Sequence, residues 1–316
     1  MTHQLSPVKE GFPVHKITVV GSLNMDLVVN TPWIPALGET ILGSGFFTAP
    51  GGKGANQAVA AARLGGSVAM VGCVGNDIFG QELVKNLTDN GVNIEHVRLL
   101  DNTPTGIAMI TVKDGDNFII VNPGANAGLT PEMIENIEDL IKESYIVIIQ
   151  LEIPVETVER TICLAKKHGV KVLLNPAPAG NLPEELLQKV DIITPNEKEC
   201  EFLTGVAVNC VEDAKAALQV LKGRGIPQVL ITLGAGGVVY NNGDEVVHKP
   251  ARCVKAVDST AAGDAFTGAL AVAIAKGKQI GDAVDFASIA GALTVTKSGA
   301  QKSLPAKEDV EDFVKP

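Results

Sequence analysis

The chain has 316 residues, of which 46% are hydrophobic and 4% aromatic, and its 26 basic and 36 acidic side chains give a formal net charge of −10. The apolar content excludes a disordered chain, and the length suffices for a large α/β domain with a buried core. An acidic chain lacks the basic surface that displaces counterions from nucleic acids, so we expect no nucleic-acid partner. Thirty-three glycines against one Trp and two Tyr favour tight turns and close backbone approach over aromatic-lined surfaces.

The chain carries no signature of export or membrane insertion. Residues 1–15 are polar and lack the apolar segment of a secretory signal, and no run approaches the roughly 18 apolar residues of a spanning helix. The cysteines are scattered with no C-x-x-C pair, which favours free thiols over a disulfide framework or a zinc site. They are Cys73, Cys163, Cys200, Cys210 and Cys253. We therefore expect a cytoplasmic protein without a membrane partner, and we assign residues 1–15 to an N-terminal tail of no specified function.

Short β-branched runs alternate with amphipathic stretches along most of the chain. The expected strands are 17–20, 68–71, 146–150, 170–174, 191–194 and 228–233. The expected helices are 56–64, 80–90, 131–143, 155–168, 212–223, 263–276, 280–296 and a short one from about 307. Continuously apolar strands separated by helices predict an α/β fold with a doubly wound, mostly parallel central sheet flanked by helices.

Two segments break this alternation. Residues 25–31 and 106–121 alternate apolar and polar side chains, and Asp114-Gly115 is a hairpin turn signal within the second segment. They predict a small antiparallel β flap, or lid, with strands drawn from about 23–50 and 104–122. Because no linker or change of composition interrupts the chain, we expect one domain over 16–316.

The first stretch with chemical potential is residues 50–56, which lead into an Ala-rich helix. It is not a phosphate-binding P-loop, because Gly54 follows Lys53 where that motif requires Ser or Thr. Gly52 and its neighbouring glycines let the backbone approach a ligand, and Lys53 and Asn56 supply donors at a helix start. The stretch suits a polyhydroxylated or anionic ligand, and an ordinary loop-to-helix turn remains an equal alternative.

The second stretch follows the first expected strand. Asn24 and Asp26 alternate along an extended chain, so both side chains can point to one side. The carboxyl ends of parallel strands are where ligands bind in a doubly wound sheet. An amide and a carboxylate together can hold several sugar hydroxyls, although a local Asx turn explains these residues better if they are taken alone.

The third stretch, residues 258–264, opens an apolar helix. Ala261, Ala262 and Gly263 lack bulk, so their N–H groups can converge on an anion at the positive helix end. A carboxylate beside an anion site is unfavourable unless it has a task, and Asp264 could accept the proton of an attacking hydroxyl. The alternative is a common favourable acid in the first helical turn.

Two further turns follow expected strands. Asn196 and Glu199 can form a capping box, or they can lie near nucleotide phosphates with Glu199 holding Mg²⁺ through water. Residues 232–237 form a G-x-G-G turn that could admit a nucleotide or reverse the chain. The pattern disfavours a dinucleotide fingerprint, because 238–240 is expected to continue as a strand where that motif needs a helix.

Together and in this order, the five stretches resemble the ribokinase-like (PfkB) carbohydrate kinase family over about residues 16–303. Residues 150–152, 175–179 and 299–301 add to this resemblance, particularly to the branch that acts on ribose. The resemblance implies ATP-dependent phosphorylation of D-ribose at O5, with Asp264 as general base and residues 261–263 as an anion hole. The alternatives are a sister kinase for 2-deoxyribose, another sugar or a nucleoside, and a sugar-binding regulator without catalysis. A nicotinamide dehydrogenase is disfavoured by the missing fingerprint.

The resemblance also implies a set of binding residues. The sugar would be held by Asn24, Asp26, Gly52, Lys53, Asn56, Glu152 and Asp264. ATP would be contacted by Asn196, Thr232, Gly234, Gly237, Gly263 and Ser288. Mg²⁺ would bind Glu199 through water, and an activating K⁺ would bind Asp258, Thr260, Thr294, Lys297, Gly299 and Ser303. In the family the flap also pairs with its twin, which implies a homodimer.

Two positions depart from the family pattern. Ala261 stands where most members have glycine, so the helix entry reads A-A-G-D and not G-A-G-D. Ser288 stands where an adenine-contacting Asn or His is usual, which weakens the expectation of that contact.

Overall fold

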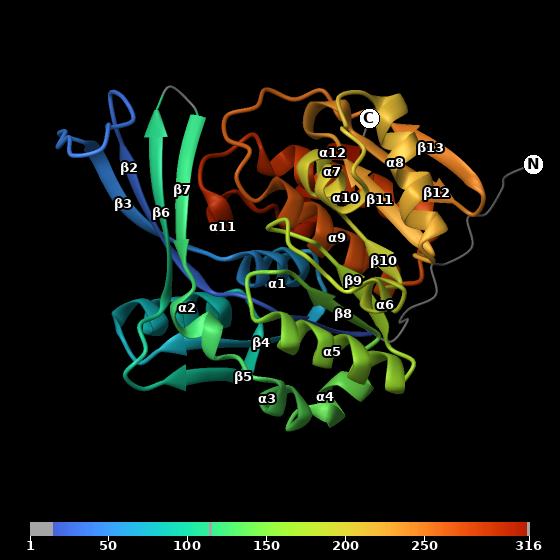
Figure 1. Cartoon of the computed structure of the whole chain (residues 1–316), viewed down its shortest axis with the longest axis horizontal. Helices are drawn as coiled ribbons and strands as arrows, with labels where there is room; N and C mark the ends of the chain where they lie inside the picture. The colour runs from blue at the N-terminus through green and yellow to red at the C-terminus, as the bar shows by residue number, and fades with distance from the viewer. Residues whose placement is uncertain (1–14, 114–115, 315–316) are drawn as a thin grey trace, which may run out of the picture.

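The protein is built on a nine-stranded sheet, seen in a computed structural model that describes residues 15–113 and 116–314 (Figure 1). The strand order is β13-β12-β11-β10-β9-β8-β1-β4-β5. All neighbours from β5 to β11 pair in parallel, and β12 and β13 add an antiparallel hairpin at one edge. The strands are β1 (Lys16–Val20), β4 (Ser67–Gly75), β5 (Asn93–Leu100), β8 (Ile146–Ile149), β9 (Lys171–Leu174), β10 (Ile192–Ile193), β11 (Gln228–Thr232), β12 (Val238–Asn242) and β13 (Glu245–Lys249).

Helices cover both faces of this sheet, which explains why its strands are continuously apolar. In β8, Ile146 and Ile148 pack into one core cluster, whereas Val147 and Ile149 pack into the other. The first cluster includes side chains of α1 (Lys53–Arg63), α2 (Ile78–Asp89), α9 (Ala262–Ala275), α10 (Ile280–Thr294) and α12 (Lys307–Val314). The second includes side chains of η1 (Gly124–Gly128), α3 (Pro131–Glu135), α4 (Glu138–Glu143), α5 (Val155–Lys167), α6 (Glu184–Leu187), α7 (Glu197–Thr204) and α8 (Val211–Gly223). The predicted doubly wound α/β fold is therefore confirmed.

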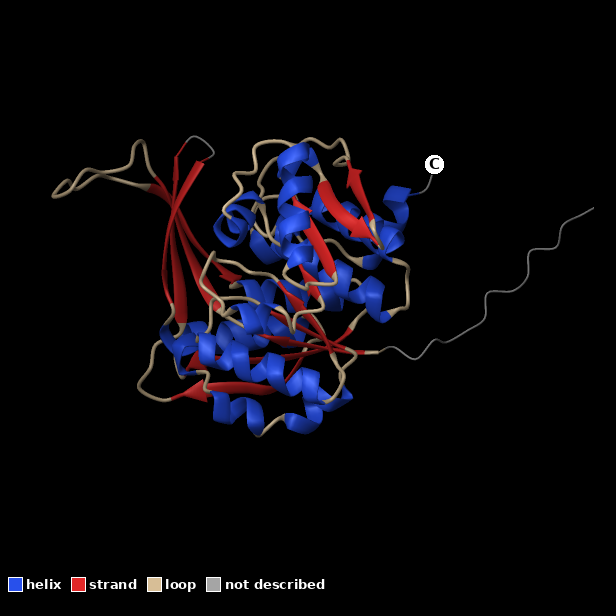
Figure 2. Cartoon of the chain, turned by 45° about the vertical axis from the view of Figure 1, so that its right-hand side comes forward, coloured by secondary structure: helices blue, strands red, loops and turns tan. Residues whose placement is uncertain are grey.

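A separate four-stranded sheet forms the lid, which projects from the body of the molecule (Figures 1 and 2). Its order is β3 (Ser44–Gly51), β2 (Asn24–Asn30), β6 (Gly106–Lys113) and β7 (Asp116–Asn122). The two outer pairs are antiparallel as expected, and the central β2–β6 pair is parallel, a detail that the alternation did not predict. The turn expected at Asp114-Gly115 lies outside the described residues.

Several elements differ from the sequence-based expectation for physical reasons. The helix expected over 131–143 is interrupted between α3 and α4, where Ile137 leaves the helical conformation with φ −116°. Strand β3 lies within the range 23–50 expected for lid strands, but its segment was not singled out because it contains Gly45 and Pro50, which are unfavourable in strands. Strand β5, whose side chains mostly face solvent on its outer edge, was also missed.

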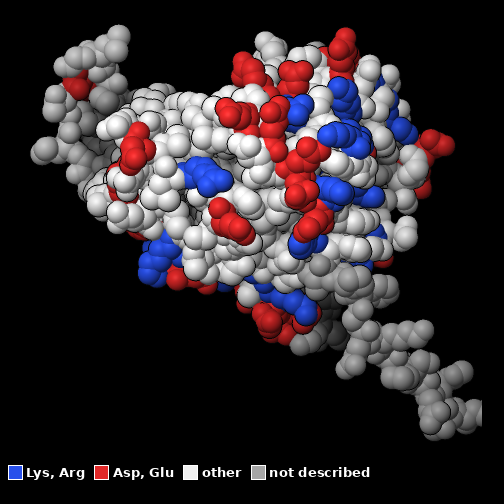
Figure 3. Space-filling model, turned by 90° about the horizontal axis from the view of Figure 1, so that it is seen from below, with Lys and Arg blue, Asp and Glu red and all other residues white. Residues whose placement is uncertain are grey.

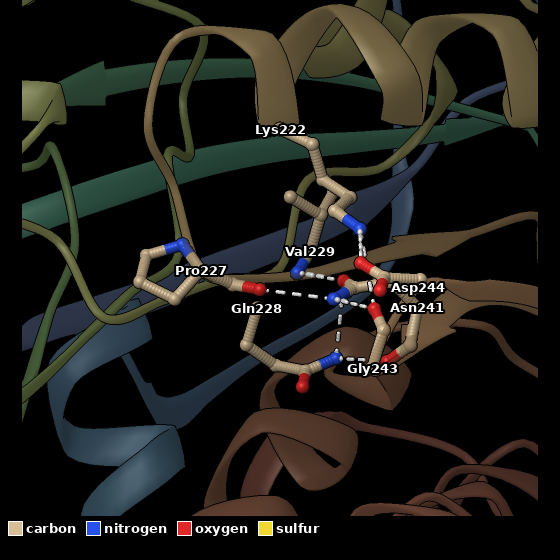
Figure 4. A network of polar contacts seen from close by, with 7 residues as sticks. All are labelled: Lys222, Pro227, Gln228, Val229, Asn241, Gly243 and Asp244. Carbon is tan, nitrogen blue, oxygen red and sulfur yellow. Dashed lines mark hydrogen bonds and ion pairs between the residues drawn. The ribbon is translucent and has the colours of Figure 1, made fainter.

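Asn241 ties the edge hairpin to the parallel part of the sheet (Figure 4). Its buried side chain accepts the N–H of Val229 at 2.7 Å and donates to the carbonyl of Pro227 at 2.9 Å. The amide thus satisfies both backbone groups at the start of β11. At the opposite end of this strand, Thr232 lines a cavity.

Acidic and basic side chains are interspersed over the face of the molecule seen in Figure 3. Across the part of the chain that the structure describes, none of the helices combines the length and the apolar character needed to cross a membrane.

Candidate active site

A cavity of about 200 Å³ lies where strands β9, β10 and β11 end and helix α9 begins. Its lining draws on four of the five stretches singled out in the sequence. The residues are Lys53, Asn175, Ala177, Thr194, Asn196, Glu199, Thr232, Ser259, Ala261, Gly263, Asp264 and Thr267. The carboxyl edge of the sheet is therefore the candidate site, as the parallel topology predicts.

Asp264 lies buried in the first turn of α9 with both carboxylate oxygens hydrogen-bonded. Asn56 donates to Oδ2 at 2.9 Å and Gln57 donates to Oδ1 at 2.9 Å. Burial raises the pKa of this carboxyl, while Lys53 and the two amides act in the opposite direction. The site thus holds a proton acceptor between donors in a desolvated position, which suits general base catalysis.

Lys53 balances a group of carboxylates around the cavity. Burial alone lowers the pKa of its ammonium, but three carboxylates outweigh that effect and raise the pKa. They belong to Asp264, Glu152 and Glu199. Lys53 is therefore a half-buried cation at neutral pH, and it offers positive charge to an anionic ligand in the cavity.

The side chains expected to bind sugar gather around the start of β2. Glu152 accepts the backbone N–H of Lys53 at 3.1 Å and the Nδ2 donor of Asn24 at 3.5 Å. Burial, followed by the charges of Glu152 and Asp264, raises the pKa of Asp26 to about 7. A cluster of carboxylate and amide groups on this side can exchange these internal contacts for the hydroxyls of a sugar.

Two glycines permit this close arrangement. A Cβ on Gly51 would lie 2.4 Å from the carboxylate oxygens of Asp26. Gly52 has φ +86°, and a Cβ there would lie 2.6 Å from the backbone nitrogen of Asn24. Both positions require glycine, because any side chain would displace the Asn24 and Asp26 segment.

The entry to α9 forms the opposite side of the cavity. Ala261 adopts φ +61°, a left-handed conformation that costs a residue with a Cβ roughly 1–2 kcal/mol. A Cβ on Gly263 would meet no atom within 4 Å, so this residue faces open space. The expected anion hole is less complete for Ala262, whose N–H donates to the carbonyl of Ser259 at 3.2 Å.

The capping-box interpretation of Asn196 and Glu199 is confirmed, and the alternative role beside nucleotide phosphates stays a prediction. Asn196 Oδ1 accepts the Glu199 N–H at 2.9 Å, and Glu199 Oε2 accepts the Asn196 N–H at 2.9 Å, which makes the capping box. The same two side chains line the cavity beside Asp264. The Glu199 carboxylate at this cavity fits the expected Mg²⁺ contact through water, because Mg²⁺ binds few protein oxygens and keeps several waters or phosphate oxygens. Among the residues described, no group of three or more His, Cys, Asp or Glu could itself enclose a metal.

Two of the residues expected at the K⁺ site, Thr260 and Gly299, contact Asp258 directly. Its Oδ1 accepts the Thr260 N–H at 2.9 Å and its Oδ2 accepts the Gly299 N–H at 2.8 Å. Burial raises the pKa of Asp258, but these backbone donors outweigh it and the net pKa is lowered. Thr294 ends helix α10, and the N–H of Lys297 in the next turn donates to its carbonyl at 3.2 Å. The Ser303 hydroxyl donates to the carbonyl of Ala300 at 2.7 Å.

Three residues expected to contact ATP are absent from the lining of this cavity within the described part of the chain. They are Gly234, Gly237 and Ser288. Gly237 turns the chain from β11 into β12, where a Cβ would lie 2.0 Å from the carbonyl oxygen of Lys249. Gly234 has φ +50° at the start of the same turn, so chain reversal explains both glycines. Ser288 lies half-buried on α10.

Other polar residues at the site were missed by the sequence reasoning. Asn126 donates to Asn24 Oδ1 at 2.8 Å and accepts the N–H of Leu23 at 2.9 Å, so it orients the start of β2. Gln57 and Gln150 lie fully buried behind Asp264. A polar residue at position 57, within an otherwise apolar Ala-rich helix, is the signal that could have identified this layer.

A larger cleft of about 310 Å³ lies at the foot of the lid, between β3 and α11 (Ala300–Ser303). Arg63 on its wall donates to the carbonyls of Gln301 and Leu304 at 2.7 and 2.8 Å. The cleft adjoins the Asp258 segment through Gly299, and it contains none of the residues around Asp264.

Comparison with known proteins agrees with this geometry. The model of the pfkB family of carbohydrate kinases matches residues 14–307. The chain belongs to the pfkB carbohydrate kinase family. Residues 51–56 and 258–264 are the stretches that resemble the two signatures of the family. They meet where Asn56 donates a hydrogen bond to Asp264.

Three relatives illustrate how far the similarity extends within the pfkB family. A ribokinase of Haemophilus influenzae is 43% identical over 300 residues, which span 94% of this chain and 98% of that protein. A deoxyribokinase of Salmonella typhi is 39% identical, with 94% and 98% of the two chains covered. The structure of Arabidopsis thaliana ribokinase complexed with ribose and ATP has a TM-score of 0.90 and 35% identity, and it covers 96% of this chain and 99% of that one.

Proposed function

We propose that this protein transfers the γ-phosphoryl group of ATP to O5 of D-ribose, giving D-ribose 5-phosphate and ADP. The observation that carries this proposal is the position of Asp264. Its carboxylate lines a cavity at the N-terminus of α9 together with Lys53, and it accepts a hydrogen bond from Asn56, another of the side chains proposed to bind the sugar. That arrangement provides the three groups that phosphoryl transfer to an alcohol needs: a base, a means to position the alcohol, and stabilisation of the phosphate charge.

In the proposed reaction, Asp264 accepts the proton of the ribose 5-hydroxyl as the oxygen attacks the γ-phosphorus. The new O–P bond forms while the bond to the β–γ bridging oxygen breaks, and ADP leaves with that electron pair. The backbone around Ala261 and Gly263 faces the charge on the transferring group, with the Ala262 amide reached only if its contact with Ser259 opens. Lys53 adds positive charge nearby.

The sugar is proposed to lie against Asn24, Asp26 and Glu152, with further contacts from Gly52, Lys53 and Asn56. Asn56 Oδ1 is buried without a hydrogen-bond partner in the structure, so it can accept a sugar hydroxyl. A site that hydrogen-bonds a hydroxyl rejects the analogue lacking it by up to about 10⁴–10⁵-fold. The alternative substrate is 2-deoxyribose, since one relative of similar identity is a deoxyribokinase.

ATP is proposed to lie along the ends of β10 and β11, against Asn196 and Thr232. Gly234, Gly237 and Ser288 are proposed further along the same path, toward the adenine. Mg²⁺ would be held by Glu199 through water, where it neutralises phosphate charge. The capping box orients the Glu199 carboxylate for this task while its other contacts remain intact.

A monovalent cation is proposed beside the helix entry. Asp258 would supply a carboxylate, and carbonyl oxygens of Thr260, Thr294, Lys297 and Gly299, together with Ser303, would complete the shell. The depressed pKa of Asp258 supports a permanent negative charge there. An oxygen-only shell suits K⁺, which would act by fixing the loop that leads into α9.

We further propose that two copies of the chain pair through their lids. The support is a set of large apolar side chains that stay exposed on the lid strands: Phe46, Phe47, Met109, Phe118, Ile119, Ile120 and Val121. Such edges and faces are liabilities unless they are covered. Changing Phe118 to Asp should give monomers in analytical ultracentrifugation, whereas a dimer of unchanged affinity would contradict lid pairing. The five free cysteines support a reducing, cytoplasmic location.

The direct test is an ADP-release assay with ribose, 2-deoxyribose, fructose and adenosine as acceptors. Ribose should give the highest kcat/KM, and Asp264→Asn should lower kcat by about 10²–10⁴-fold. Asp282→Asn is the matched control, because Asp282 lies exposed in the first turn of the neighbouring helix α10. Near-normal turnover by Asp264→Asn would contradict the mechanism, and turnover of no acceptor would favour a sugar-binding regulator.

A further inference from the structure

A continuous row of buried amides lies behind the Asp264 carboxylate. Gln57 on α1 is fully buried, and its Nε2 donates both to Asp264 Oδ1 at 2.9 Å and to Asn175 Oδ1 at 3.0 Å. Its Oε1 accepts from Nε2 of Gln150 at 2.6 Å. The row therefore connects the helix that carries Lys53 to the ends of strands β8 and β9.

One backbone carbonyl determines the direction of every hydrogen bond in this row. The carbonyl oxygen of Thr194 can only accept, and Nδ2 of Asn175 donates to it at 3.0 Å. Asn175 must then present Oδ1 to Gln57, so Gln57 must turn its NH₂ group toward both Asn175 and Asp264. The Gln57 amide therefore always donates to Asp264, whichever substrate is present.

Packing around the row keeps it in this orientation. A Cβ on Gly21 would lie 1.9 Å from Oε1 of Gln150, so the glycine makes room for that amide. Gln57 and Gln150 are both fully buried, so their amides do not contact bulk solvent. The direction of the row is therefore a fixed property of the fold.

A donor fixed against Oδ1 favours the ionised form of Asp264. The other groups that face this carboxyl divide in their effects. Lys53 and the Asn56 amide also favour ionisation, whereas the charges of Glu152, Asp26 and Glu199 oppose it. Burial opposes it most strongly. Gln57 is a fixed donor among these influences, and it leaves the remaining lone pairs of Oδ2 for a substrate hydroxyl.

We propose that Gln57 is a positioning residue for phosphoryl transfer, which holds the Asp264 carboxylate ionised and turned toward the attacking hydroxyl. This inference rests on the proposed function, because it assumes that Asp264 is the base. It adds a residue that touches neither substrate and that acts only through Asp264. Gln150 and Asn175 support it by fixing the orientation of the Gln57 amide.

The test is the pH profile of kcat for Gln57→Met and Gln57→Glu at saturating ribose and ATP. Gln57→Met removes the donor at similar length, so kcat should fall about 10–100-fold, as expected for a lost hydrogen bond to a charged group. The acid limb of the profile should move upward by about 1–2 pH units, because the base now protonates more easily. Gln57→Glu should move it at least as far, since a second carboxyl then faces Asp264.

Two further variants make the result independent of simple loss of folding. Gln150→Met keeps the donor on Asp264 but loosens its support, so it should shift the acid limb less than Gln57→Met does. Thr161→Val removes a buried hydroxyl that donates to Thr157 in α5, far from the site, and should leave the limb in place. An acid limb that stays in place in both Gln57 variants, with or without a loss of kcat, would overturn the inference. Full activity of Asp264→Asn would overturn the proposed function instead.

Discussion

The proposed sugar side and the proposed phosphate side of the site differ in the kind of group that they offer to a ligand. On the proposed sugar side, next to the cavity, the groups expected to meet the ligand are side chains, chiefly those of Asp26, Asn24 and Glu152. On the proposed phosphate side, the entry to α9 contributes Ala261 and Gly263 to the lining, and these residues can offer only backbone groups to a ligand. A neutral polyol needs hydrogen-bond donors and acceptors in a specified pattern. A polyanion needs only donors, and backbone N–H groups suit it because they do not titrate.

This difference decides what a substitution can change. On the proposed sugar side, we expect single substitutions to change which sugar is accepted, because each hydroxyl is expected to meet one side chain. At Ala261 and Gly263, by contrast, a substitution acts mainly through its effect on the backbone conformation. Asp264 lies at the boundary and belongs to both.

The largest effect after loss of the base is expected from Asp26→Ala. Removing this carboxylate deletes hydrogen bonds from a charged group to ribose, so kcat/KM for ribose should fall by about 10²–10⁴-fold. KM for ATP should stay within about threefold of the original value, since no backbone donor is touched. Steady-state kinetics with each substrate varied would check both. An equal loss for ribose and ATP would show that the two sides are not separable.

The pH dependence of ribose binding is expected to follow Asp26. Burial and the neighbouring Glu152 and Asp264 raise its pKa to about 7, so the carboxylate is protonated progressively below that pH. A protonated acid loses acceptor capacity, and KM for ribose should therefore rise about tenfold from about pH 8 to about pH 6. In Asp26→Asn, whose side chain does not titrate, the change should be much smaller. The same rise in that variant would assign the effect to another group.

Much of this fold was predictable from sequence, and the reasons are local. The short, β-branched apolar run at 146–149 correctly predicted a strand buried on both faces, and Asn196 with Glu199 correctly predicted a capping box. The parallel β2–β6 pairing was not predictable, because it joins segments about 80 residues apart and depends on how the lid is mounted.

The residues of the site that belong to short sequence motifs were predictable. Lys53, Asn196, Gly263 and Asp264 do share one cavity. Gln57 and Asn126 were not predicted, because a buried amide has no periodic signature and its partners come from distant segments. The conformation of Ala261 was also hidden, since only a structure reveals a positive φ at a non-glycine residue.

Monovalent cation dependence would sharpen the description of the phosphate side. With K⁺ as the only monovalent cation, kcat should exceed that in Na⁺ alone by about tenfold, the effect of roughly one hydrogen bond to a charged group at the helix entry. Asp258→Asn should abolish this difference while KM for ribose stays nearly constant. Equal rates in the two buffers would count against a cation site at Asp258.

The smallest expected effect comes from Ala261→Gly. Glycine adopts the left-handed conformation without penalty, so the free energy of unfolding should increase by about 1 kcal/mol. Activity should change by less than about twofold, because the backbone donors stay in place. Ala262→Gly is the matched control and should decrease stability, since Ala262 has a helical conformation in α9. Urea denaturation of the two variants would decide; a loss of stability in Ala261→Gly would contradict the account of strain.

The central claim is transfer of phosphate to O5 of ribose. The most direct measurement is the proton-coupled ³¹P NMR spectrum of the product formed from ribose and ATP. A phosphate on O5 couples to the two protons of C5 and gives a triplet. A doublet, which indicates a phosphate on a carbon bearing one proton, would contradict the claim, as would the release of inorganic phosphate alone.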